Sequence, residues 1–140
     1  MTISGVGDTV RATYENVNIW GTMIGGATVM LGNGNNTVSL AAAGSIAPGG
    51  NHVTVGNGCN GIAVGGSGNV IAVGNGANGV TLNGNGNMVT VNDPTGVGND
   101  IVQLEGGTGD VVNLCHAAGS ATGTGPATGL TTVSQTGRTP

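Results

Sequence analysis

The chain has 140 residues, of which 31 are glycine, and its only aromatic side chains are Tyr14 and Trp20. So few large side chains cannot fill the core of a helix-rich domain, and a charged fraction of 6 % is not typical of a disordered chain either. The net charge of −4 sets six carboxylates against Arg11 and Arg138, which excludes nucleic acid as a partner because phosphate binding needs a basic surface.

Residues 1–26 form an N-terminal segment that contains one weak copy, at residues 7–12, of the repeat described next. We expect this segment to contribute or cap the first coil of the fold, with its apolar side chains covering that coil: Val10, Val17, Ile19 and Trp20. The first ten residues have no basic stretch followed by an apolar run, so we expect no cleaved secretory signal. No run of 18 apolar residues predicts a membrane span.

The central segment, residues 27–114, repeats every nine residues with the pattern Asn, any residue, Val or Ile, any residue, Val or Leu. Five copies follow one another at constant spacing, at residues 51–55, 60–64, 69–73, 78–82 and 87–91. Further copies lie at residues 27–31 (without the Asn), 36–40, 100–104 and 110–114, the last two with Asp in place of Asn. Irregular insertions interrupt the array at residues 41–50 and 92–97.

The alternation of apolar residues predicts short strands with one buried face, and the Gly-rich tetrapeptides between them predict turns. Two nine-residue units make one flattened coil, so each strand pairs in parallel with its copy 18 residues later, at a spacing of about 4.8 Å. The sequence therefore predicts an all-β fold, a parallel two-sheet β-solenoid of about five coils. Its inner faces would be lined by Ile62, Val64, Val80 and Leu82 from one sheet and by Val53, Val55, Ile71, Val73, Val89 and Val91 from the other.

The repeat resembles the nonapeptide Gly-Gly-x-Gly-x-Asp-x-(apolar)-x of the repeats-in-toxin (RTX) calcium-binding proteins, most closely at residues 98–102 and 107–112. The resemblance implies a parallel β-roll in which the sixth-position Asp holds Ca²⁺ between coils. Through the middle of this chain that position is an amide: Asn36, Asn51, Asn60, Asn69, Asn78 and Asn87. An amide both donates and accepts hydrogen bonds, so we expect these residues to form a ladder that requires no cofactor.

Asp8, Asp100 and Asp110 occupy the corresponding position near the two ends of the array, and two interpretations of them stay open. They are polar residues of the end coils, or they bind calcium at coil ends or subunit junctions. In the second interpretation Ca²⁺ bridges the last coil of one molecule to the first coil of the next, with Glu105 as a further ligand.

The alternation also predicts which side chains point outward. On one sheet Gly61, Ala63, Gly79 and Thr81 would form a flat face of small residues. On the other sheet the outward positions form a weakly charged stripe, a candidate lateral interface: Val70, Ala72, Met88 and Thr90.

Residues 115–140 are expected to form a Gly/Ala/Thr-rich linker, at residues 117–129, followed by a terminal strand at residues 130–134. That strand caps its own solenoid or pairs with a neighbour's edge. Cys59 and Cys115 lie almost three coils apart, which predicts two free thiols. A zinc site formed by the cysteines with His52 and His116 lacks the usual ligand spacing.

The few dispersed carboxylates and the lack of a Ser/His/Asp or Cys/His arrangement predict that the protein is not an enzyme. Ice binding is disfavoured because Ala63 and Ala72 interrupt the outward threonines. The open ends of a solenoid predict a structural protein that assembles with itself, end to end, into a filament or surface fibre. The alternative is a secreted calcium-binding RTX-like module or adhesin.

We expect an extracellular or cell-surface location from the absence of lysine and the low charge, with a cytoplasmic filament as the alternative because of the two cysteines. A carbohydrate or another surface partner along the faces is left open.

Overall fold

A computed structural model describes residues 1–14, 16–22, 25–41, 49–96, 98–115, 119–124 and 130–136. All regular elements among these residues are β-strands. In chain order they are β1 (Thr2–Ile3), β2 (Thr9–Tyr14), β3 (Asn18–Thr22), β4 (Thr28–Asn33), β5 (Thr37–Ala41), β6 (His52–Val55), β7 (Gly61–Gly65), β8 (Val70–Val73), β9 (Gly79–Asn83), β10 (Met88–Asn92), β11 (Asp100–Glu105), β12 (Asp110–Cys115), β13 (Gly119–Thr124) and β14 (Leu130–Thr136). No helix in the described ranges is long and apolar enough to cross a membrane.

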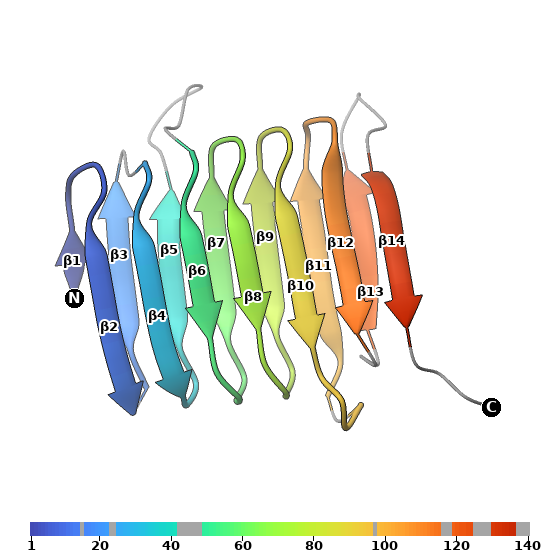
Figure 1. Cartoon of the computed structure of the whole chain (residues 1–140), viewed down its shortest axis with the longest axis horizontal. Coiled ribbons are helices and arrows are strands. Elements are labelled where there is room, and N and C mark those ends of the chain that lie inside the picture. The colour runs from blue at the N-terminus through green and yellow to red at the C-terminus, as the bar shows by residue number, and fades with distance from the viewer. Residues whose placement is uncertain are drawn as a thin grey trace.

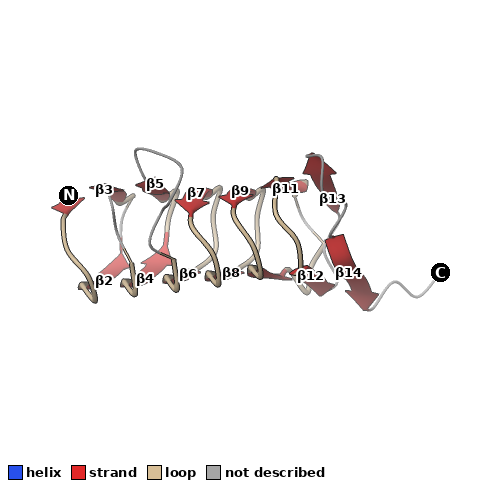
Figure 2. Cartoon of the chain, turned by 90° about the horizontal axis from the view of Figure 1, so that it is seen from above, coloured by secondary structure: helices blue, strands red, loops and turns tan. Residues whose placement is uncertain are grey.

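The strands form two parallel sheets, and the chain alternates between them at every turn. One sheet has the order β1-β3-β5-β7-β9-β11-β13 and the other β14-β12-β10-β8-β6-β4-β2. Figure 1 shows the coils stacked from the N-terminal end on the left to the C-terminal end on the right, and Figure 2 shows the two layers from above. The predicted parallel two-sheet β-solenoid is confirmed, and the ten predicted repeat copies form β2 and β4 to β12.

The strand register confirms the 18-residue coil. Val53 pairs with Ile71, and Ile71 pairs with Val89, each 18 residues further on. The pairing distance grows to 24 residues between Val29 and Val53 and to 22 residues between Val80 and Val102. These longer coils contain the two predicted insertions, of which residues 42–48 and 97 lie outside the described part of the chain.

The core is a thin column of aliphatic side chains between the two sheets. Every inner position predicted from the alternation is buried, with exposed fractions of 3 % or less. The core continues in both directions along the stack through Ile3, Val10, Ile19, Val29, Leu31, Val38, Leu40, Val102, Leu104, Val112 and Leu114. Apart from Ala27, every buried core residue in the described part of the chain is Ile, Val or Leu, and each of these side chains packs on its copies in the neighbouring coils.

Glycine is required at the turns because neighbouring turns lie against one another. Gly58 has a φ of +136° and Gly84 a φ of +127°, in the range that favours glycine. A Cβ atom at Gly58 would overlap the carbonyl oxygen of Gly34 in the adjacent coil, and one at Gly84 would overlap that of Gly66. The glycine content is therefore a consequence of coil stacking as well as of turn conformation.

The two ends of the chain differ from expectation in two respects. Val10 and Ile19 are buried and Val17 is half-buried, as expected, but Trp20 points outward from β3 and is 59 % exposed. Within the segment expected to be a linker, Gly119–Thr124 forms β13 and pairs with β11. The terminal strand is present as β14, which pairs with β12 of its own solenoid. Residues 116–118, 125–129 and 137–140 lie outside the described residues, as does His116 of the disfavoured zinc site.

Replacement of Ile71 by alanine is expected to lower the free energy of unfolding by about 3 kcal/mol, because it leaves a cavity in a fully buried layer. Val70→Ala, one residue earlier on β8 and facing solvent, is the matched control and should cost less than about 1 kcal/mol. Urea unfolding monitored by circular dichroism measures both. Equal losses for the two variants would contradict the inward and outward assignment.

Candidate functional site

Two rows of buried amides run along the stack, one at each edge of the flattened coil. The first row lies in the turns before β5, β7, β9 and β11, with side-chain Nδ2 to Oδ1 distances of 3.0 Å for Asn36–Asn60, 2.9 Å for Asn60–Asn78 and 2.8 Å for Asn78–Asp100. The second lies before β6, β8, β10 and β12, with distances of 2.9 Å for Asn51–Asn69, 2.9 Å for Asn69–Asn87 and 3.0 Å for Asn87–Asp110. The expected asparagine ladder is present, and it is double.

Asn36, Asn60, Asn69 and Asn78 bond both to neighbouring coils and to carbonyls of their own turns. Oδ1 of Asn69 accepts from the backbone N–H of Asn51 at 3.0 Å and from its Nδ2 at 2.9 Å. Nδ2 of Asn69 donates to Oδ1 of Asn87 at 2.9 Å and to the carbonyl of Gly66, in its own turn, at 2.7 Å. The amide therefore serves as donor and acceptor at once, with an exposed fraction of 0 %.

The buried ladders have a direction. At each step the donors belong to the earlier coil and the acceptor to the later coil, as in Asn36 to Asn60 and Asn60 to Asn78. At the N-terminal end the rows begin with backbone donors alone, since Val17 N–H bonds to Asn36 and Ala27 N–H to Asn51, both at 3.1 Å. At the C-terminal end each row finishes on an aspartate, whose carboxylate needs only to accept.

A second set of amides in the exposed turns was not predicted. The backbone N–H of Asn57 donates to Oδ1 of Asn33 at 2.9 Å, and that of Asn75 donates to Oδ1 of Asn57 at 3.0 Å. Here the later coil donates to the earlier one, opposite to the buried ladders. The recurrence of Asn at the second position of the Gly-rich tetrapeptides, at residues 57 and 75, was the available signal in the sequence.

The expected ligands of an intermolecular calcium site are placed differently from the hypothesis. Asp8 lies in the first turn, half-buried beside Gly5, in the row of Ala27 and Asn51. Asp100 and Asp110 are buried, with exposed fractions of 1 % and 2 %, and are followed by a further pair of strands, β13 and β14. They therefore lie inside the stack, where a neighbouring molecule cannot reach them.

Glu105, the remaining expected ligand, is exposed at the far end of β11 from Asp100. No group of three or more His, Cys, Asp or Glu among the described residues is placed to hold a metal ion. Cys59 is exposed and Cys115 half-buried, and both are free thiols as predicted.

Asp100 differs from the asparagines of its row in one atom. Its Oδ1 accepts from N–H and Nδ2 of Asn78 at 3.0 and 2.8 Å, but its buried Oδ2 has no hydrogen-bond partner. Burial raises the pKa of the Asp100 carboxyl, and the nearby Asp93 carboxylate raises it further, while the bonds from Asn78 act in the opposite direction.

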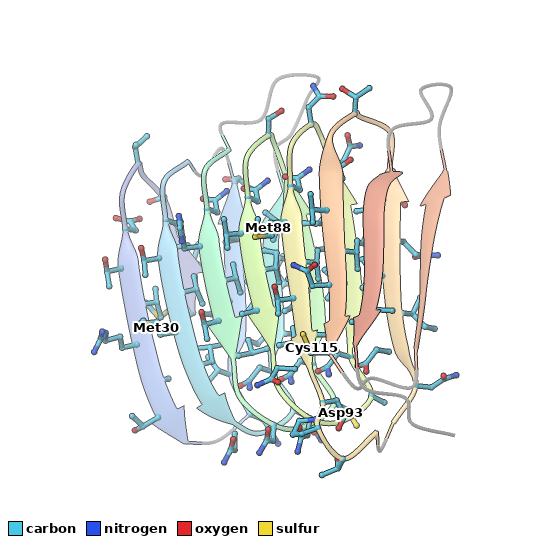
Figure 3. The ribbon with its side chains drawn as sticks, turned by 45° about the vertical axis from the view of Figure 1, so that its right-hand side comes forward. Met30, Met88, Asp93 and Cys115 are labelled. Atoms are coloured by element: carbon cyan, nitrogen blue, oxygen red, sulfur yellow. The ribbon has the colours of Figure 1, made fainter. Side chains whose placement is uncertain are left out.

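The candidate lateral interface lies on the outer face of the sheet that contains β8 and β10. Val70 pairs with Met88, and their side chains are 36 % and 42 % exposed, while Ala72 and Thr90 form the next row and are half-buried. Met30, on β4 of the same sheet, is also exposed, and Figure 3 shows Met30 and Met88 standing on this face. The outward orientation of the stripe is confirmed.

Comparison with known proteins identifies no relative: no family model matches the chain, and neither a curated protein nor a solved structure matches it. The β-solenoid fold therefore rests on the strand topology, and the resemblance to RTX repeats rests on the sequence pattern alone.

Asn69→Ala is expected to lower the free energy of unfolding by about 3 kcal/mol, because it removes the buried hydrogen bonds of one amide with Asn51, Asn87 and Gly66. Asn57→Ala, which removes one exposed acceptor, should cost about 1 kcal/mol or less. Urea denaturation in a chelating buffer compares them. Similar losses of unfolding free energy for both variants would show that a buried ladder amide stabilises the fold no more than an exposed turn amide does.

Asp100→Asn is expected to stabilise the calcium-free protein at neutral pH by about 1 kcal/mol, because Asn provides the donor that the other ladder positions have. A raised pKa means that the folded chain holds the proton more tightly than the unfolded chain, so stability falls as the pH rises from 3.8 through the raised value. The variant should lose that part of the pH dependence. Thermal unfolding across this pH range measures it.

Glu105→Gln, on the same strand, makes the same change in net charge at an exposed position and is the control. An Asp100→Asn variant that is less stable than the unaltered protein at neutral pH would contradict the interpretation of the ladder end.

Proposed function

We propose that this protein is a structural subunit that assembles with copies of itself, end to end, into a filament or surface fibre. The observation that carries the proposal is the position of the sheet edges. At one end of the stack β1 and β2 are the outer strands, and at the other end β13 and β14 are, with no further strand beside them among the described residues. Unpaired strand edges are templates for pairing with another chain.

The two ends match in sheet and in strand direction. If a second copy is translated along the stack, its β2 lies next to β14 of the first copy and its β1 next to β13, and the two strands of each new pair run parallel to each other. Such a contact joins two different surfaces, and because it does not close on itself it generates a filament. The stack in Figure 1 has the geometry that this repetition needs, since its two ends face in opposite directions.

The edges carry few of the devices that natural proteins use to block strand addition. Neither β2 nor β14 contains lysine or proline, and Arg11 is the one charged residue of the two strands. β14 has a register shift opposite Asp110 and Val111, but the following pairs, from Val111 with Thr132 to Cys115 with Thr136, are regular. Most of the C-terminal edge thus keeps the parallel register of the sheet.

The outward face of β8 and β10 supports contact between neighbouring filaments. Val70 and Met88 stand side by side there with little charge around them, and Ala72 and Thr90 continue the same surface. Lateral association through these residues would bundle filaments into a fibre.

An RTX-like module in which calcium holds every coil is the alternative, and it has less support. In the central coils the ladder amides bond to one another at 2.9 Å, where such a module would have carboxylates around an ion. Retention of the folded state in a chelating buffer is the outcome that separates the proposal from this alternative.

Arg11→Pro is expected to abolish assembly and leave the subunit folded. Thr28 N–H donates to Asp8 O, so the alternation of parallel pairing directs the N–H of Arg11 away from β4 and toward an incoming strand. Proline removes that donor without breaking a bond to β4. Light scattering coupled to size-exclusion chromatography and negative-stain electron microscopy would show filaments for the unaltered protein and monomers for the variant.

Arg11→Ala removes the same side chain but keeps the backbone donor, and it should still assemble. An unaltered protein that stays monomeric at high concentration would refute the proposal, and so would an Arg11→Pro variant that forms filaments as before.

A further inference from the structure

The turn between β10 and β11 is unlike the other turns of its row. Asp100 follows Asn78 by 22 residues, whereas Asn78 follows Asn60 by 18, so this coil has four additional residues. Two buried side-chain oxygens of this turn, Oδ2 of Asp93 and Oδ2 of Asp100, have no hydrogen-bond partner. Every other buried polar side-chain atom in the described part of the chain has a hydrogen-bond partner. A buried acceptor without a donor is costly, which makes this pair the strongest candidate for a bound ligand.

The position of Asp100 Oδ2 follows from the coil before it. In Asn78 the corresponding atom is Nδ2, which donates to the carbonyls of Gly74 and Gly76 at 2.9 and 3.2 Å. Gly98 stacks on Gly76, so by register its carbonyl takes the corresponding place beside Asp100. A carboxylate oxygen and a carbonyl oxygen then face each other, both acceptors, and a positive ion between them would bond to both.

Asp93 supplies the second carboxylate from within the insertion. Its Oδ1 accepts from Thr95 N–H at 3.1 Å, from Thr95 Oγ1 at 2.7 Å and from Gly96 N–H at 2.9 Å, and its own N–H donates to the carbonyl of Cys115 at 3.2 Å. These bonds fix a side chain with an exposed fraction of 0 %, and Figure 3 shows Asp93 in the turn at the lower edge of the solenoid. The Asp93 carboxylate is close enough to Asp100 to act on it electrostatically.

We propose that this turn binds one Ca²⁺ ion within a single molecule, between Oδ2 of Asp93 and Oδ2 of Asp100. Hard divalent cations take oxygen ligands, and Ca²⁺ accepts irregular coordination by carboxylates and backbone carbonyls. Mg²⁺ fits less well, because it gives up its water reluctantly and a buried turn has little room for a hydrated ion. The site is independent of self-assembly, since neither residue lies at the end of the stack.

Isothermal titration of the full-length protein with CaCl₂, after removal of metal by chelation, tests the proposal at pH 7.5. The expected stoichiometry is one ion per chain. Thermal unfolding is expected to shift upward by about 5 °C or more when Ca²⁺ exceeds its dissociation constant by about 100-fold. Asp93→Asn and Asp100→Asn should each abolish the heat signal and the thermal shift. Asp100→Asn should remain folded, because Asn is the residue found at the other positions of its ladder.

Asp110→Asn makes the same change at the end of the other ladder, on the opposite edge of the coil, and should keep the full response to Ca²⁺. The absence of binding at millimolar Ca²⁺ would overturn the proposal. It would also be overturned by a response that survives Asp93→Asn or Asp100→Asn, or by one that Asp110→Asn abolishes.

Discussion

The structure depends on one interaction, the hydrogen bond from the side-chain amide of one coil to the side-chain oxygen of the next. Asn69 and Asn87 show it at its simplest, since the side-chain oxygen of each accepts both the backbone and the side-chain donor of the preceding asparagine in its row. A chain of 140 residues with only two aromatic side chains cannot obtain stability from a thick core. Its fold is stabilised instead by contacts that repeat from coil to coil. One row of hydrogen-bonded amides lies at each edge of a narrow aliphatic core.

This interaction explains why the repeat tolerates so little variation at some positions and so much at others. The amide, the inward branched residues and the glycines of the turns each touch their own copy in the next coil, so their size is set by the stacking distance. The outward side chains face solvent and do not pack in the core. They vary from Gly61 and Gly79 on one sheet to Val70 and Met88 on the other. Surface chemistry can therefore change without disturbing the scaffold.

Much of the fold could be predicted from the sequence because the same residue pattern recurs in successive coils, so that each type of contact is encoded several times. Alternation placed Ile71 and Val89 inside, and the nine-residue spacing brought Asn69 next to Asn87. The exceptions lie where repetition stops. β13 has no Val or Ile and pairs because β11 offers an edge, while Asp93 stands in an insertion with no copy to compare it with. Trp20 faces outward because Ile19 takes the inward position of β3.

The regularity of the central coils has an evolutionary consequence. Because Asn69 receives the same donors that it passes on to Asn87, an 18-residue unit is interchangeable with its neighbours. Duplication or loss of 54 nucleotides would lengthen or shorten the rod by one rung, about 4.8 Å, and leave both tips untouched. Such a protein can change its reach in fixed increments by recombination between repeats, without passing through an unstable intermediate sequence.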